Sequence, residues 1–242
     1  MRTIGLLTII GIFICVGTVA QTQDSYDYNS EFIWGVNKNS SSGLIGGLVF
    51  KKSRRANEYM FETYGLELIN VRHPQEVRKT AQGGNFFIFG KSNYLYAVRL
   101  QYGRDFILFQ KAPQQGVEIK GVLSAGPTIG IVAPYYIERA IDGPGLQTIK
   151  EQYDPSNPNH SYDNIYGNGG IFYGIGESKI QLGGNLKAAL NFETGMLKSQ
   201  VTGFEVGFLL DAYTKKVVMV PTAENYAVYP TIFLTIFYGS RK

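Results

Sequence analysis

The chain has 242 residues, enough for one large domain or two small ones. Charged residues make up only 17% of it, against about 25% in a typical soluble domain, whereas Gly (29), Tyr (17) and Phe (15) are abundant. The net charge of +4 is mild and no Lys/Arg-rich run resembles a nucleic-acid footprint, so we expect no nucleic-acid partner.

The N-terminus has the pattern of a secretory signal peptide, predicted to span residues 1–20. Arg2 precedes a short apolar stretch, and small residues place the cleavage site after Ala20. An uncleaved membrane anchor is the alternative. The only cysteine, Cys15, lies in this segment, so the exported chain is expected to have no disulfide. A polar leader, residues 21–30, follows.

The rest of the chain divides into eight segments that are typical of β-strands. They span residues 31–38, 43–52, 58–71, 93–102, 116–133, 179–194, 200–213 and 226–239. No apolar run after the signal peptide is long enough for a membrane-spanning helix. Short and long connections alternate, and the longest is a predicted external loop near residues 134–178. Outer-membrane barrels show this arrangement of short turns at one end and long loops at the other.

Residues 179–194 show the alternation best. One face carries Ile180, Leu182, Leu186, Leu190 and Phe192; the other carries Lys179, Gln181, Asn185, Lys187 and Glu193. In a soluble ligand-binding barrel the apolar face would point inward, and in a membrane barrel it would face lipid. Strand length and aromatic residues near strand ends favour the membrane. Glycines on the polar faces favour a crowded lumen, namely Gly126, Gly130, Gly203 and Gly207. We therefore predict an all-β, eight-stranded antiparallel transmembrane β-barrel of meander topology over residues 31–242.

Several segments carry a resemblance to a known group. They are "KSNYLYAVRLQYGRDFILFQK", "GVEIKGVLSAGPTIGIVAPYYIE", "FEVGFLLDAY" and the C-terminal "YPTIFLTIFYGSRK". Together with the signal peptide and the strand pattern, they resemble the small outer-membrane β-barrel proteins of Bacteroidota, the PorT-like group. The resemblance implies a Gram-negative cell outer membrane, an eight-stranded barrel and both termini in the periplasm. It implies no enzymatic activity.

Charged residues on the polar faces form the main candidate site. They are Glu67, Arg99, Glu118, Lys120, Lys187, Glu193, Glu205 and Asp211. The lumen of an eight-stranded barrel is only wide enough for side chains to fill it. Buried charges must pair, so we predict a structural luminal charge network. A narrow proton or ion path is the alternative.

The sequence carries only weak signals for a catalytic or metal site. His73 and His160 are predicted to be surface residues of external loops. His160, with Ser161 and nearby Asp154 and Asp163, has the residue types of a lipid-acting barrel enzyme, but no G-x-S-x-G motif is present. The stretch "DPSNPNHSYDN" lacks the residue order of a calcium loop. We expect no catalytic site, cofactor or metal.

These features together predict a monomeric outer-membrane barrel with a structural or accessory role. It would serve as a scaffold or partner-binding subunit, with a link to protein secretion as one form of that role. Its partners would be outer-membrane lipid and another envelope protein that contacts the loops or periplasmic turns. The basic stretch "KKSRR", residues 51–55, is predicted to be such a turn. The alternatives are the lipid-acting enzyme and the soluble secreted barrel.

Overall fold

The computed structural model describes residues 28–42, 45–110, 116–141, 147–170, 173–194 and 199–242. The predicted signal peptide and most of the polar leader lie outside these ranges. The long strands are β1 (Ser30–Asn39), β2 (Gly47–Asn57), β3 (Met60–Val71), β6 (Asn93–Phe109), β7 (Glu118–Pro134), β11 (Lys179–Glu193), β12 (Gln200–Tyr213) and β13 (Val228–Arg241). Within this part of the chain, no helix has the length and apolar character needed to cross a membrane.

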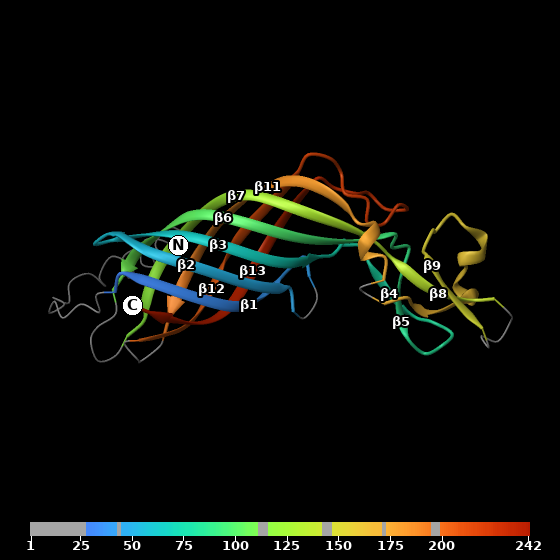
Figure 1. Cartoon of the computed structure of the whole chain (residues 1–242), viewed down its shortest axis with the longest axis horizontal. Helices are drawn as coiled ribbons and strands as arrows, with labels where there is room; N and C mark the ends of the chain where they lie inside the picture. The colour runs from blue at the N-terminus through green and yellow to red at the C-terminus, as the bar shows by residue number, and fades with distance from the viewer. Residues whose placement is uncertain (1–27, 43–44, 111–115, 142–146, 171–172, 195–198) are drawn as a thin grey trace, which may run out of the picture.

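The long strands form one closed antiparallel barrel in the order β1-β13-β12-β11-β7-β6-β3-β2. Strands that follow one another along the barrel wall are neighbours, and β1 closes the barrel against β13 with Trp34 opposite Tyr238. The predicted all-β, eight-stranded antiparallel meander is confirmed. The described chain begins and ends at one end of the barrel, here called the terminal end, where the backbone N–H of Asn29 donates a 2.9 Å hydrogen bond to the carbonyl of Lys242. The long connections that contain β4, β5, β8 and β9 lie at the other end, the loop end (Figure 1).

The faces of β11 show how the barrel wall is built. Ile180, Leu182 and Leu186 are 73%, 62% and 59% exposed on the outer face, whereas Asn185 and Lys187 are buried inside. β12 and β13 alternate between exposed and buried at every residue. Apolar side chains therefore cover the outside and polar ones fill the inside, which is the reverse of a soluble ligand-binding barrel.

The predicted placements of Lys179 and of residues 51–55 were wrong. Lys179, predicted to face the lumen, is exposed at the loop end of β11. The stretch 51–55, predicted to be a turn, lies within β2, where Lys51 points inward and is buried. Because β2 runs on to Asn57, alternation continues through this basic stretch and places Lys51 inside and Lys52 outside.

The connections at the loop end contain strands that the sequence did not reveal. They are β4 (Val77–Thr80), β5 (Phe86–Phe89), β8 (Tyr136–Ala140), β9 (Thr148–Gln152) and β10 (Ile165–Asn168). β4 pairs with β5, and β10, β8 and β9 form a three-stranded sheet. We call these five strands, together with the described residues between β4 and β5 and between β8 and β10, the cap (Figure 1). Their short strands, separated by turn-forming residues, lack the length that makes alternation recognisable.

The cap has its own apolar core, which joins it to the barrel wall. Phe87, Tyr135 and Ile165 are buried together there with Tyr94 and Ala133, from the loop ends of β6 and β7. The Tyr135 hydroxyl accepts a 2.9 Å hydrogen bond from the backbone N–H of Ile88. The long connection predicted near 134–178 is therefore a packed structure rather than a bare loop.

The β12–β13 connection closes the loop end of the lumen. Val217 and Met219 are almost completely buried, and they pack with Val71 and Leu95 on the inner faces of β3 and β6. The Asn225 side chain accepts a 2.8 Å hydrogen bond from the backbone N–H of Met219 and so holds the connection in place. An apolar plug therefore covers the polar lumen from this end.

Close approach between strands explains the glycines of the inner face. A Cβ at Gly207 would lie 2.3 Å from the carbonyl oxygen of Ala188, too close for an alanine without a backbone shift. We expect Gly207→Ala to lower the free energy of unfolding by roughly 1–3 kcal/mol, because overpacking forces such shifts. Urea unfolding followed by gel migration measures this. Gly184→Ala is the control, since its Cβ would lie 3.7 Å from the nearest atom; an equal loss there would contradict the expectation.

Candidate functional site

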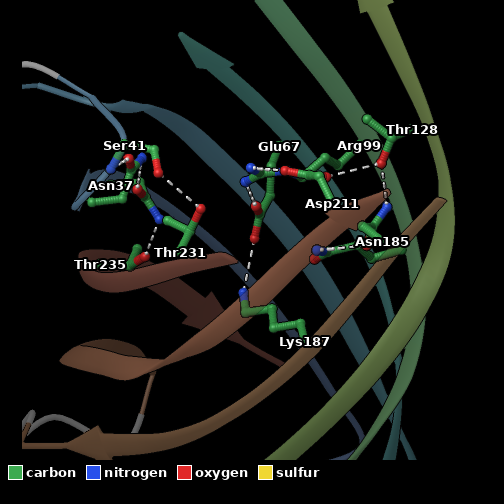
Figure 2. Close-up of polar contacts among 12 residues, drawn as sticks. Asn37, Ser41, Glu67, Arg99, Thr128, Asn185, Lys187, Asp211, Thr231 and Thr235 are labelled. Carbon is green, nitrogen blue, oxygen red and sulfur yellow. Dashed lines mark hydrogen bonds and ion pairs between the residues drawn. The ribbon is translucent and has the colours of Figure 1, made fainter. Parts of the chain in front are cut away.

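Arg99 lies at the centre of the luminal network (Figure 2). Its Nη1 lies 3.0 Å from Glu67 Oε2, and its Nη2 lies 2.5 Å from Asp211 Oδ2. Its Nε also donates to Asp211 Oδ1 at 3.0 Å, so the guanidinium grips this carboxylate with two nitrogens. Thr128 donates a further 3.2 Å hydrogen bond to Asp211. The position is set by the sheet register, because Arg99 pairs directly with Glu67 of β3 and Thr128 of β7.

The chain of ion pairs continues from Glu67 toward the terminal end. Lys187 Nζ lies 2.8 Å from Glu67 and 2.6 Å from Glu205. Lys51 Nζ lies 3.4 Å from Glu205 and 2.6 Å from Asp105. All these side chains are buried. Alternating charges thus run in one continuous series from Asp211 to Asp105, drawn from five strands of the barrel wall.

A second group of charges fills the terminal end. Lys120 Nζ lies 3.0 Å from Glu118 and 3.4 Å from Glu31. Arg241 Nε lies 3.0 Å from Glu31, and its Nη2 donates to Glu193. Residues far apart in the sequence therefore meet here because β1, β7, β11 and β13 bring their terminal ends together.

Tyr28 covers this second group. Its hydroxyl accepts a 2.6 Å hydrogen bond from Lys120 and donates one of 3.1 Å to Glu118. Its ring stacks on Phe61 at 4.8 Å, and the Arg241 guanidinium lies 3.9 Å from its centre. A residue of the predicted polar leader thus completes the inside of the barrel.

The structure brings all eight predicted luminal residues to the inner face, where each is buried and ion-paired. Four charged partners and one tyrosine were missed: Glu31, Lys51, Asp105, Arg241 and Tyr28. Arg99, Gln101 and Asp105 are separated by even numbers of residues and so share one face of the strand. Extending the predicted strand past residue 102 would therefore have placed Asp105 in the lumen. Arg241 lies beyond the predicted end of the last strand for the same reason.

This arrangement is suited to holding the barrel together. A buried charge is costly unless it is paired, and here every cation has at least one carboxylate within 4 Å. Uncharged groups engage some of the remaining lone pairs, as where Asn191 donates a 3.2 Å hydrogen bond to Glu205, whereas Asp105 Oδ1 and Glu193 Oε1 have no hydrogen-bond partner among the described residues. Cross-strand pairs that require particular partners also specify one register of the wall.

Both histidines were predicted to be surface residues, and this prediction was wrong. His160 is buried in the cap, and His73 is buried at its base. His160 Nδ1 accepts from the backbone N–H of Asp154 at 2.9 Å, and its Nε2 lies 3.0 Å from Glu151. His73 Nε2 lies 2.8 Å from the carbonyl of Glu224. The Asp154 carboxylate accepts a 2.9 Å hydrogen bond from the backbone N–H of Ser156, and it is not part of a Ser–His–Asp arrangement. Within the described ranges, His, Cys, Asp and Glu form no group of three placed to hold a metal ion.

Comparisons with known proteins give a fold likeness only. No protein-family model matches the chain, and no curated protein matches its sequence. It is similar to the solved structure of Ail, the attachment invasion locus protein of Yersinia pestis, with 10% identity and a TM-score of 0.40 over 89% of this chain and 100% of that one. The N-terminal β-barrel domain of Pseudomonas aeruginosa OprF has 8% identity and a TM-score of 0.39, over 89% of this chain and 98% of that one. Neisserial surface protein A has 10% identity and a TM-score of 0.37, over 89% of this chain and 97% of that one. These values assign no function to the chain.

Proposed function

We propose that the chain is an integral outer-membrane β-barrel with a structural or accessory role. The observation that carries this proposal is the reversed barrel wall, with charges buried inside and large apolar side chains exposed outside on all eight strands. A water-exposed apolar surface of this extent is unfavourable, whereas in lipid it is the stable arrangement. A closed barrel also leaves no unpaired strand edge in the bilayer.

The functional surfaces of the protein are then the parts that lie outside the bilayer. The plug at the loop end and the two groups of ion pairs fill the lumen, which supports a scaffold rather than a channel. The cap presents exposed apolar side chains, among them Phe86, Ile141 and Tyr162. Exposed aromatic and aliphatic side chains on a rigid support are typical of protein-binding surfaces. We therefore assign the cap, or the turns at the terminal end, to contact with another envelope protein.

The filled lumen predicts an absence of conductance. Purified protein in planar lipid bilayers should give no stepwise current, because side chains of the plug and the ion-paired series occupy the path. A deletion of residues 216–224, which removes the plug, serves as the comparison. Discrete openings in the unaltered protein would contradict the closed lumen, and would favour the ion-path alternative.

Membrane integration and partner binding are tested separately. Heat-modifiable migration on a gel and fractionation with the outer membrane support the barrel; a soluble monomer without detergent would overturn it. Photo-crosslinkers at Tyr162 and Ile141 of the cap should capture an envelope protein, whereas one at Leu186 on the barrel wall should capture only lipid. No protein crosslink from the cap or from Tyr59 at the terminal end would count against the partner-binding role.

The PorT-like resemblance extends this proposal to protein secretion in a Gram-negative cell. This extension requires that the partner captured by the crosslinkers belong to a secretion apparatus. The proposed role is not enzymatic, and His160→Ala, which disrupts the histidine most open to a catalytic reading, should leave the lipid profile unchanged.

A further inference from the structure

A large cavity lies outside the barrel wall at the loop end, between the wall and the β4–β5 hairpin. Its volume is about 1020 Å³. It is lined from the wall by Asn70, Tyr94, Tyr96 and Ile131, and from the hairpin side by Arg72, Arg78, Phe86 and Lys91, among others. A cavity of this size accommodates a ligand much larger than a single ion.

The floor of the cavity continues into the apolar outer surface. Asn70 pairs with Tyr96, Tyr96 pairs with Ile131, and Ile131 pairs with Ile180, so the four form one row across β3, β6, β7 and β11. Ile180 is 73% exposed on the outer face. The next row toward the terminal end is fully apolar, since it pairs Leu68, Val98, Ile129 and Leu182. The cavity therefore lies where the apolar belt gives way to polar residues.

The hairpin side of the cavity is basic. Arg72, Arg78 and Lys91 line this side together. Burial lowers the pKa of the Lys91 ammonium, Glu76 opposes this, and the charges of Arg72 and Arg78 lower that pKa further. Glu76 neutralises Lys91 through a 2.6 Å ion pair. Among the residues that the structure describes, neither Arg72 nor Arg78 has an ion pair of its own. Two guanidinium groups at this place therefore lack an anion.

Two polar atoms in the floor are also unused. The Tyr96 hydroxyl and Asn70 Oδ1 are shielded from water, and neither has a hydrogen-bond partner within the described ranges. Buried polar groups are normally satisfied, and each exception calls for an explanation. Because the two residues are paired across β3 and β6, the floor offers a donor and an acceptor side by side.

We infer that this cavity binds the phosphorylated sugar headgroup of a lipid in the outer leaflet. Arg72 and Arg78 would contact phosphate, for which the planar guanidinium is the preferred partner. Tyr96 and Asn70 would bond sugar hydroxyls after a small side-chain movement, and the tyrosines suit the polar–apolar boundary. The acyl chains would lie along the outer wall past Ile180 and Leu182. This inference rests on the proposed membrane placement.

The test measures lipid binding to the full exported chain in detergent micelles by native mass spectrometry. The probes are diphosphorylated, monophosphorylated and dephosphorylated lipid A, with phosphatidylglycerol as a non-sugar anion. We expect binding to weaken in that order of lost phosphates, and phosphatidylglycerol to bind weakly. Equal binding of the three lipid A forms would overturn the inference, as would equal binding of phosphatidylglycerol. So would displacement of lipid A by millimolar inorganic phosphate, because that result assigns the cavity to a soluble anion.

Matched variants locate the site. The double change R72Q/R78Q should weaken binding of diphosphorylated lipid A about tenfold or more, since two charge-assisted contacts are lost. R54Q/R104Q, which removes the same charge from exposed positions nearer the terminal end, should leave binding unchanged. Equal effects of the two pairs would overturn the assignment to this cavity. The order of affinities among the lipids is read on the unaltered protein, so a misfolded variant does not remove the test.

The two proposals fail in different ways. A heat-modifiable protein of the outer membrane that shows no phosphate preference would overturn the lipid site and leave the barrel proposal intact. A soluble protein would overturn the membrane proposal, and with it the assignment of the cavity to a membrane lipid.

Discussion

Arg99→Gln should lower the free energy of unfolding by roughly 3–5 kcal/mol, because breaking a buried pair leaves an uncompensated charge. Asp211 would keep only the 3.2 Å hydrogen bond from Thr128, while Glu67 would keep Lys187. Urea unfolding in detergent, followed by the shift between folded and unfolded gel bands, measures the loss. Glu58→Gln is the control, since Glu58 is exposed in the β2–β3 turn and should change stability by less than about 0.5 kcal/mol.

A second variant distinguishes charge imbalance from lost packing. R99Q/D211N removes the orphaned carboxylate together with its partner, so it should be more stable than the single R99Q variant. Coupling energies between residues in contact are about 0.5–3 kcal/mol. If the double variant is as unstable as the sum of the two single ones, the pair contributes by shape alone and the electrostatic account of the lumen is wrong.

Leu186→Arg should cost roughly 2–4 kcal/mol and impair assembly, because an arginine near mid-membrane must leave water. Leu186 is 59% exposed on the outer wall, in the middle of β11. Outer-membrane yield and the amount of heat-modifiable protein are the measurements. In water the same change would be nearly neutral, so its cost reports directly on the lipid contact of this face.

Two comparisons make that result specific. Val77→Arg alters a side chain of similar exposure (55%) on β4 of the cap, outside the barrel wall, and should be tolerated. Asn185→Leu alters the neighbouring inner-face residue, which bonds to Gln101, Thr128 and the wall backbone, and should be harmful. Tolerance of Leu186→Arg together with normal assembly would show that the outer wall does not meet lipid.

The barrel strands were predictable because each is long and amphipathic. A two-residue period over some fourteen residues, as in 179–194, fixes which side chains share a face, whatever the surroundings. The strand boundaries were predicted less accurately, and the error with the largest consequence was at β6. Its predicted end at residue 102, rather than Phe109, left Asp105 in a connection and outside the luminal set.

The cap escaped prediction for a different reason. Its strands have four or five residues each, so alternation is too brief to recognise. Their pairing depends on contacts between distant residues, such as Phe87 with Tyr135 and Ile165. His160 illustrates the consequence, because the polar stretch around it predicts a surface loop, yet its partner Glu151 belongs to β9 and buries it.

The sequence alone determined the number of barrel strands, their meander order and the sets of residues that share a face, because these follow from local periodicity. Only the tertiary structure decided which charges meet. Barrel closure and the stagger between strands place Arg99 against Asp211, and Arg241 against Glu31, across 112 and 210 positions of the chain. The cavity beside Tyr96 belongs to the same class, since it exists only where the β4–β5 hairpin lies beside the wall. Period-two alternation encodes the direction of a side chain, whereas its partner depends on how the whole sheet curls.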